Sequence, residues 1–486
     1  MKVALYCTVT LIILLLHTSH GYRTVIVGAG LSGYSAAARL LERGVNDILV
    51  LEAENRIGGR VHTVPFHNGR IDMGAQWVHG QQNNIIYEMV GAHFPFGDSA
   101  WENAADMFLL SDGTARNQTQ IAQLAHLAEG IMAVVYDPSY TGSFGSFFEY
   151  HYWNALNNEP YRAIPRSLAT KVQHFYHTYT NNFFGSKSWF DISIEIYANA
   201  GYTLGSQWVT WRDSGFSTVF EFLSKRRPFP QQALDVESKI LVNKEVTNIN
   251  WDGAVITLRC ADNSQYLADY VIFTGSLGVL KHRHNTLFTP TLPARKTSAI
   301  QYSDYGSLEK IFLEFSAPFW DQSYNFAEFS ILWTERDIAE LTGTSREWLI
   351  HIGYFRRIDA FPTLLGVFFI GARIPDFNAF DQNKIINDCH WLLSRAYTPN
   401  VPRPINAIRS NWITLRNFMG AYSLFTPTSA YYGATPSRLA EPVNGSNGRP
   451  RIFFAGEHTS QLFSGYANGA VETGYRAAAE VLSAVV

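Results

Sequence analysis

The sequence predicts an α/β protein of two domains, and three observations lead to this prediction. Near the N-terminus, "RTVIVGAGLSGYSAAARLLERG" has the pattern of a strand, a glycine turn and a helix. Near the C-terminus, "IFFAGEHTSQLFSGYANGAVETGYRAAAEVL" repeats that order. The 486 residues exceed what a single hydrophobic core usually holds. One domain is therefore expected to combine both ends of the chain, and the long middle to supply the second.

The N-terminal turn has the spacing G-x-G-x-x-G, with glycines at Gly28, Gly30 and Gly33. The first permits a tight turn, the second lets the backbone approach a pyrophosphate, and the third brings the helix close to the strand. A second strand, "DILVLE", ends at Glu52, where a carboxylate accepts hydrogen bonds from ribose hydroxyls. Because strand, turn, helix, strand and acid occur in this order, the sequence predicts a Rossmann-type dinucleotide site.

The residues after Glu52 bear on whether this site binds NAD or FAD. In "EAENRIGGR", Gly58 and Gly59 allow the backbone to approach a second edge of the diphosphate, and Arg60 supplies a cation for it. An ordinary loop would account for the two glycines. It would not account for "RIDMGAQWVHG", in which small residues precede a bulky Trp77. The extension favours FAD.

Residues 1–21 predict a secretory signal peptide that is cut near Gly21. Lys2 precedes the apolar run "VALYCTVTLIILLL", and small residues follow it. A membrane anchor is the alternative, but about fourteen apolar residues are fewer than the roughly 20 that a spanning helix needs. We therefore expect a secreted, extracellular protein without stable membrane insertion.

Composition and single residues bear on the partners and the covalent modifications of the protein. The formal net charge of −3 argues against a nucleic-acid partner, and we expect no metal. Asn117 in "NQT" and Asn444 in "NGS" are candidate glycosylation sites. In an oxidising compartment Cys260 and Cys389 could form one disulfide.

Six motifs in the same order make the chain resemble the flavin-dependent amine oxidases, which include monoamine, polyamine and secreted L-amino-acid oxidases. They are "VIVGAGLSG", "EAENRIGGR", "DMGAQWVHG", "FTGSLGVLK", "LEKIFLEF" with "PFW", and "FFAGEHTS" with "SGYANGA". The resemblance implies an α/β fold of two domains, a Rossmann-type FAD-binding domain and a substrate domain with a mixed sheet and flanking helices. The FAD domain would comprise residues 22–90, 206–290 and 411–486, and the substrate domain residues 91–205 and 291–410.

The resemblance also implies where the flavin binds. The cofactor contacts would be Gly28, Ala29, Gly30, Gly33, Glu52, Arg60, Gly74, Ala75, Gln76, Trp77, Val246, Gly456 and Glu457. No cysteine lies near Tyr422, so the thioether bond of the monoamine oxidases is not expected and FAD should be held non-covalently.

Four residues are implied to act at the reacting centre, and the polyamine oxidase branch (spermine/spermidine oxidase-like) fits best. In that branch the lysine that matches Lys310 holds a water against the flavin N5. His79 matches a histidine of the animal-type enzymes, and Tyr422 and Tyr466 match the two rings between which the amine lies. Each has an ordinary alternative: a solvated lysine on a strand, a loop histidine, or tyrosines that only pack.

A polyamine carries several positive charges, so its binding site is expected to contain carboxylates. Glu195 is the candidate, with Asp191 or a surface role as alternatives, and Trp77 is expected to contact substrate. The implied reaction takes a hydride from the amine α-carbon to the flavin. It consumes dioxygen and yields an aldehyde, a smaller amine and hydrogen peroxide.

Three functions besides polyamine oxidation remain open at this point. An L-amino-acid oxidase needs an arginine to bind the substrate carboxylate, and Trp77, Val78 and His79 occupy the stretch where that arginine occurs in the family. A monoamine oxidase-like enzyme is the second of these functions, and a secreted FAD-binding protein without catalysis is the third.

Overall fold

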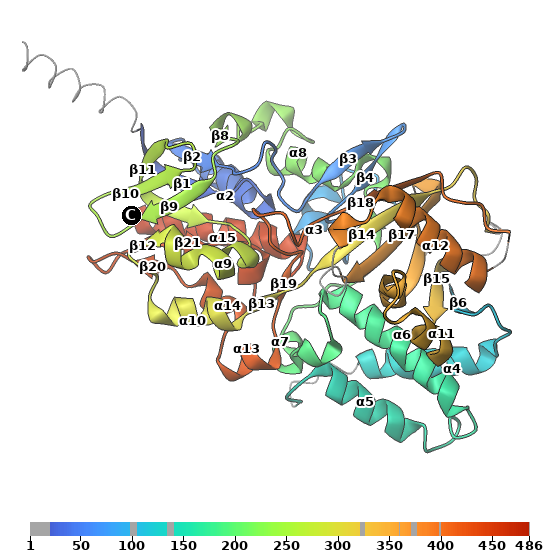
Figure 1. Cartoon of the computed structure of the whole chain (residues 1–486). Helices are drawn as coiled ribbons and strands as arrows, with labels where there is room; N and C mark the ends of the chain where they lie inside the picture. Colours follow the sequence, from blue (N-terminus) through green and yellow to red (C-terminus); the bar gives the residue numbers. More distant parts are fainter. Residues whose placement is uncertain are drawn as a thin grey trace, which may run out of the picture.

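The computed structural model describes residues 20–97, 105–133, 140–320, 326–358, 360–370, 377–397 and 400–485. The predicted signal peptide lies almost entirely outside these ranges, and its cleavage near Gly21 stays a prediction; the first described strand, β1, begins at His20. Among the described helices, none is both long enough and apolar enough to cross a membrane. The chain forms two lobes, each built on one sheet (Figure 1).

The first lobe contains a nine-stranded sheet that combines both ends of the chain with its middle. The main order is β12-β9-β10-β11-β1-β2-β8, and β21 also pairs with β11 and with β20. Strands β21, β11, β1, β2 and β8 run parallel at its centre. Their bounds are β1 (His20–Val27), β2 (Ile48–Leu51), β8 (Ile240–Leu241), β9 (Val246–Asn250), β10 (Ile256–Cys260), β11 (Gln265–Phe273), β12 (Phe288–Thr289), β20 (Val443–Asn444) and β21 (Pro450–Phe454).

Alternation along the central strands gives this sheet two buried faces. Ile26 and Val50 face α2 (Leu31–Glu42) and α15 (Ala467–Val485), whereas Val25 and Leu49 face α9 (Leu277–Leu287) and α10 (Ala294–Tyr302). The helices α2 and α15 lie side by side, since a Cβ on Gly474 would stand 2.3 Å from the carbonyl oxygen of Ser32. The sequence prediction assigned residues 291–302 to the second domain, but α10 packs in the core of this first lobe.

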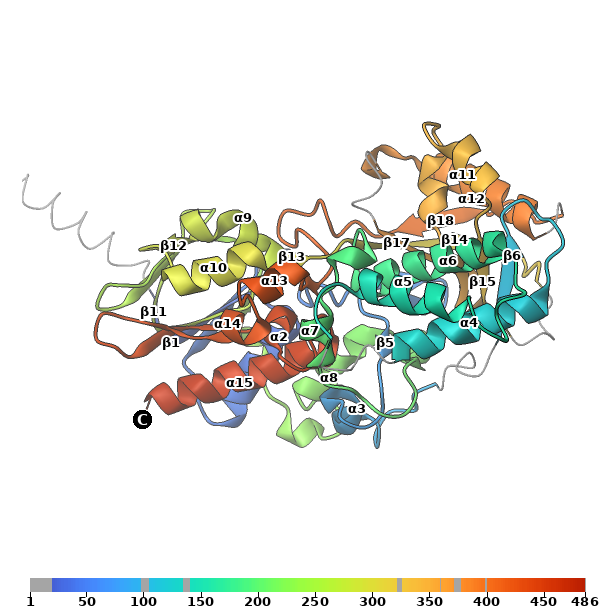
Figure 2. The ribbon, with the colours of Figure 1, turned by 90° about the horizontal axis from the view of Figure 1, so that it is seen from below.

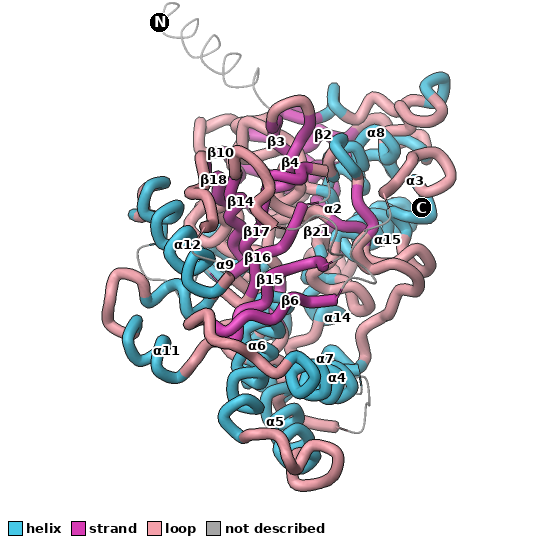
Figure 3. Tube along the Cα trace, turned by 90° about the vertical axis from the view of Figure 1, so that its right-hand side faces the viewer, coloured by secondary structure: helices cyan, strands magenta, loops and turns pink. Residues whose placement is uncertain are grey.

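The second lobe contains a six-stranded mixed sheet, which confirms the prediction (Figure 3). Its order is β18-β14-β17-β16-β15-β6, with β6 parallel to β15 and the other neighbours antiparallel. The strands are β6 (Ala105–Leu110), β14 (Leu308–Glu314), β15 (Phe326–Leu332), β16 (Tyr354–Ile358), β17 (Phe361–Ile370) and β18 (Asn406–Arg409). Helices cover both faces, α11 (Glu335–Leu341) and α12 (Gln382–Ala396) on one and α4 (Gln118–Ala133), α5 (Phe144–Ala155) and α6 (Arg166–Phe184) on the other (Figure 2).

Shorter elements complete the two lobes, and some of them carry predicted site residues. Strand β5 pairs with β7, β3 with β4, and β13 with β19. These elements are β3 (Thr63–Phe66), β4 (Gly69–Asp72), β5 (Trp77–Val78), β7 (Val209–Thr210), β13 (Asp304–Tyr305), β19 (Ser423–Leu424), α3 (Ile85–Val90), α7 (Ile194–Ala198), α8 (Val219–Leu223), α13 (Pro427–Tyr431) and α14 (Pro436–Ala440).

The possible disulfide between Cys260 and Cys389 is wrong. Both are buried free thiols, and burial raises the pKa of each. Cys260 ends β10 in the core of the first lobe, whereas Cys389 lies on α12 in the core of the second. A disulfide requires Cβ atoms about 4 Å apart, which two separate cores cannot provide.

Candidate active site

A cavity of about 630 Å³ extends from the glycine turn after β1 to the second sheet. It has the size of a cofactor or substrate site. Most of the predicted site residues line it: Gly28, Gly30, Glu52, Arg60, Gly74, Ala75, Gln76, Trp77, His79, Val246, Lys310, Tyr422, Gly456, Glu457 and Tyr466. The predicted residues Ala29, Gly33 and Glu195 do not lie on its wall.

The glycine turn presents bare backbone to the cavity. A Cβ on Gly33 would stand 1.9 Å from the carbonyl oxygen of Gly28, so the helix can approach the strand only with glycine there. Gly30 is the N-cap of α2 and has no side chain to cap the first N–H groups of the helix. Because Leu31 and Ser32 line the cavity, an anionic ligand can accept from these N–H groups.

Glu52, directly after β2, is held in place by the same turn. Its Oε2 accepts from the backbone N–H of Ala29 at 2.6 Å, and its Oε1 accepts from that of Glu54 at 2.8 Å. The predicted role of Ala29 is therefore indirect, since its N–H orients the carboxylate. Burial raises the pKa of Glu52, and the two N–H donors oppose that effect.

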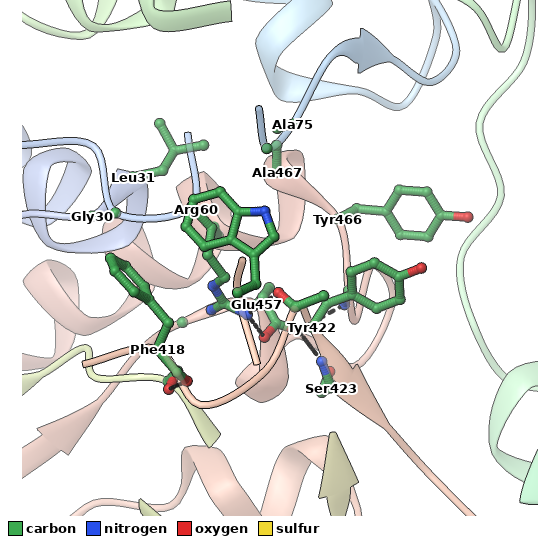
Figure 4. A pocket seen from close by; sticks show the side chains of 18 of the residues that line it. Gly30, Leu31, Arg60, Ala75, Phe418, Tyr422, Ser423, Glu457, Tyr466 and Ala467 are labelled. Atoms are coloured by element: carbon green, nitrogen blue, oxygen red, sulfur yellow. Dashed lines mark hydrogen bonds and ion pairs between the residues drawn. The ribbon is translucent and has the colours of Figure 1, made fainter. Parts of the chain in front are cut away.

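Arg60 and Glu457 form an ion pair that joins the two ends of the chain (Figure 4). Nη1 of Arg60 donates to Oε1 of Glu457 at 2.8 Å and to the carbonyl oxygen of Ala421 at 2.7 Å. Oε2 of Glu457 accepts from the Oγ of Ser423 and from the backbone N–H of Gly465. Burial opposes the charge on Glu457, but Arg60 and these donors keep the pKa of its carboxyl below the ordinary value.

Lys310 lies on the face of β14 that is turned toward the cavity. Ile311 and Leu313 pack in the core against α12, so the alternation of the strand directs Lys310 and Phe312 to the opposite side. Its Nζ lies 5.5 Å from the ring of Trp77. Burial lowers the pKa of Lys310 to about 7, so the side chain can hold or release a proton near neutral pH.

Tyr422, Tyr466 and His79 form an aromatic wall beside the lysine. The rings of Tyr422 and Tyr466 project from neighbouring segments to the same side of the site (Figure 4). The ring of His79 lies 5.5 Å from that of Tyr466. Its Nδ1 donates to the carbonyl of Gln207 at 2.6 Å, and burial lowers its pKa to about 4, so the imidazole is neutral at pH 7 with its acceptor at Nε2.

The prediction that Glu195 lines the substrate site is wrong for this structure. Glu195 lies on α7, where the neighbouring Ile196 and Tyr197 reach the cavity and the carboxylate does not. Its alternative Asp191 is exposed and does not line the cavity either. Among the described residues, the carboxylates on the wall are Glu52, Glu245 and Glu457.

We expect Glu195→Gln to leave kcat/KM within a factor of about two of wild type, since this carboxylate does not line the cavity. Steady-state kinetics of the purified variant measure the effect. A fall of about tenfold, the equivalent of one lost charge interaction, would contradict the placement of Glu195 outside the site.

Arg356 on β16 also lines the cavity, and the sequence did not predict it. Its Nη2 donates to Oε2 of Glu328 at 2.6 Å, and its guanidinium carbon lies 4.3 Å from the ring of Trp208. Tyr354, two residues earlier on the same strand, lines the cavity with it. In "GYFRRI" the alternation of the strand was the available signal, but the sequence does not reveal which face of β16 meets the cavity.

The chain matches the family described as flavin containing amine oxidoreductase over residues 31–482. It belongs to this family. Among curated relatives, this amine oxidase is 25% identical to the human peroxisomal N(1)-acetyl-spermine/spermidine oxidase, with 95% of each chain covered. It is 26% identical to polyamine oxidase 7 of Oryza sativa subsp. japonica, with 93% of each chain covered.

Solved structures show the same fold. A wild-type putrescine oxidase bound to putrescine superposes with a TM-score of 0.68 at 17% identity, covering 96% of this chain and 100% of that one. The predicted two-domain amine oxidase fold is thereby confirmed, and the chain is an FAD-dependent amine oxidase of the polyamine oxidase-like kind.

The residues of the cavity fit FAD. The uncapped start of α2 suits a pyrophosphate, and the fixed carboxylate of Glu52 suits a ribose. A Cβ on Gly59 would stand 3.2 Å from the Cα of Gly30, so the two glycine segments approach each other only without side chains. Within the described part of the chain, no group of histidine, cysteine and acidic residues is arranged to hold a metal.

Proposed function

We propose that this protein is a secreted oxidase of polyamines, acting on spermine, spermidine or their acetylated derivatives, with non-covalently bound FAD. The observation that carries the proposal is the buried Lys310 beside the aromatic wall of Tyr422 and Tyr466, at the far end of a cavity that suits FAD. The names of the curated relatives support the substrate class, and the apolar N-terminal run supports secretion.

Bound FAD would accept a hydride from the amine α-carbon and pass two electrons to dioxygen, which leaves as hydrogen peroxide. The protein's own groups prepare the amine for this step. The two tyrosine rings attract its cationic head and restrict the position of its α-carbon. The neutral Nε2 of His79 can accept a hydrogen bond from the amine and so orient it. The amine that has lost a hydride and a proton is an imine. Water converts this imine to an aldehyde and a smaller amine, and Lys310 can hold or move a proton in that step.

Non-covalent binding is supported by the position of the thiols. Neither Cys260 nor Cys389 lines the cavity, and both are packed in hydrophobic cores. We therefore expect acid precipitation or unfolding of the holoenzyme to release the yellow cofactor into solution.

Arg356 favours one second candidate, an L-amino-acid oxidase. The sequence interpretation argued against this activity because no arginine follows "DMGAQ", but the structure brings Arg356 to the cavity from β16 instead. A guanidinium can bind a substrate carboxylate through two N–H groups. The ion pair with Glu328 already neutralises Arg356, which is why the amine substrate remains our first choice.

A peroxide-coupled assay of the purified protein distinguishes these functions. We expect spermine, spermidine or an acetylated form to give the highest kcat/KM, at least about tenfold above tyramine and L-leucine, which is the discrimination that one or two lost contacts produce. Preference for L-leucine would establish the second candidate. A flavin that no amine or amino acid bleaches under anaerobic conditions would show a protein that binds FAD without catalysis.

A further inference from the structure

Lys310 is held by three oxygen atoms, of which only one belongs to a side chain. Its Nζ donates to the carbonyl oxygens of Asp72 at 3.0 Å and Gly74 at 2.6 Å, and to the amide Oε1 of Gln76 at 2.8 Å. An ammonium has three N–H donors, so these acceptors match its full capacity. Each of them stabilises the charged form over the neutral amine.

The two carbonyl acceptors are fixed, whereas Gln76 can adjust. The loop at Gly74 is closely packed, since a Cβ there would stand 1.8 Å from the carbonyl oxygen of Arg60. Gln76 has a rotatable side chain and is only partly buried. It lines the main cavity and also a second cavity of about 40 Å³, which has room for a few water molecules.

This second cavity shares Gln76 with the main cavity, but Lys310 itself does not line it. The exposed side chains of Arg70 and Arg212 line it, together with Asp72 and Gln76. Gln76 lines both cavities, as do Trp77 and Arg356, and of these three it is the one whose side chain accepts a hydrogen bond from Lys310.

We propose that Gln76 is a positioning residue that sets the proton affinity of Lys310, rather than only a contact of the cofactor. Its amide oxygen holds the ammonium in place, and rotation of the amide frees one N–H of Lys310 for water or substrate. The proposal rests on the role of Lys310 in the proposed function.

Other charges also face Lys310, and the experiment has to separate them from Gln76. The carboxylate of Asp72, from β4, favours the ammonium. His79 after β5 and Arg356 on β16 line the same cavity, and both Lys310 and Arg356 lower the pKa of His79. A substitution at Gln76 leaves all of these side chains in place. A change in pKa that requires both Gln76 and Lys310 can therefore be attributed to the contact between the two.

The test is the pH profile of the turnover number with spermine in the holoenzyme. The limb of this profile that reflects the titration of Lys310 is identified by its loss in Lys310→Met. Gln76→Glu places a negative charge beside the ammonium, and we expect it to raise the pKa of that limb by about one to three units. Gln76→Met removes the acceptor at similar volume, and we expect it to lower the pKa by about one unit. Gln81→Glu, which adds the same charge outside the cavity wall, should leave the limb in place.

A second readout does not depend on turnover. The ¹³Cε NMR signal that disappears in Lys310→Met should titrate with the same shifts in the two Gln76 variants. The proposal is overturned if the pH profile and the NMR titration of Gln76→Glu coincide with those of wild type. It is also overturned if the shift in pKa persists in a double variant that carries Lys310→Met as well. If Lys310→Met alone leaves the profile unchanged, the proposed role of Lys310 is wrong and the inference is overturned with it.

Discussion

Lys310→Met is expected to lower the turnover number about 10²- to 10⁴-fold, the range that a positioned acid or base contributes. The variant should still bind FAD, because the cofactor residues on the first sheet are unchanged. Methionine has a similar length and no charge, so it fills the volume of the lysine while the ammonium is lost and its three oxygen acceptors are left without their donor. Stopped-flow measurements of flavin reduction and reoxidation show which half of the reaction depends on the lysine.

The matched control is Lys296→Met. Lys296 is also buried, but its Nζ donates to the carbonyl oxygens of Arg438, Leu439 and Glu441 at the end of α14, away from the cavity. We expect this variant to be less stable but to keep the turnover number per bound flavin. Equal rates for Lys310→Met and wild type, again per bound flavin, would remove Lys310 from the mechanism.

Arg60→Met is expected to yield a protein that loses its flavin during purification and unfolds more readily. The substitution leaves Glu457 buried without its cation, and 7% of that carboxylate side chain is exposed. Removing one partner of a buried pair costs about 3 kcal/mol. We take the low end of the usual range because 25% of Arg60 is exposed. The ratio of flavin to protein absorbance and urea unfolding of the apoprotein measure the two effects separately.

Two further variants test whether the loss of flavin and of stability in Arg60→Met comes from the broken ion pair. Arg336→Met breaks an exposed i,i+4 pair with Glu340, so we expect the unfolding midpoint and the flavin content to stay close to those of wild type. Arg60→Met combined with Glu457→Gln should regain part of the stability, because the buried charge is then absent. If the single variant Arg60→Met keeps its flavin and its unfolding midpoint, the ion pair does not hold the cofactor half together.

The cofactor half of the site was predictable because its requirements are local. Gly28, Gly30 and Gly33 occur within one turn, and Glu52 directly follows the neighbouring strand, so a short window of sequence contains the whole pattern. The structure adds indirect roles to this prediction. Ala29 orients Glu52, and the cation of Arg60 is paired with Glu457 in addition to facing the cavity.

The substrate side of the cavity was less predictable, because it depends on which faces of helices and strands far apart in the sequence come together. Lys310 was found from its motif, and the alternation of β14 is consistent with its orientation. Glu195 was predicted at the substrate from its charge and its correspondence to an acid of the family, but α7 turns Ile196 and Tyr197 to the cavity instead. Arg356 was missed because nothing in "YFRRI" distinguishes a strand face that lines a cavity from one that packs in a core.

By itself, the sequence determined the class of fold, the dinucleotide turn and the family, and it singled out Lys310. These features follow from backbone conformation, strand alternation and motifs that each lie within a few tens of residues. Only the tertiary structure decided that the cysteines are apart, that α10 packs with the first sheet, and that Arg356 and the acceptors of Lys310 converge on one cavity. The physical reason is that side-chain environments between lobes arise from long-range packing, which brings together residues hundreds of positions apart.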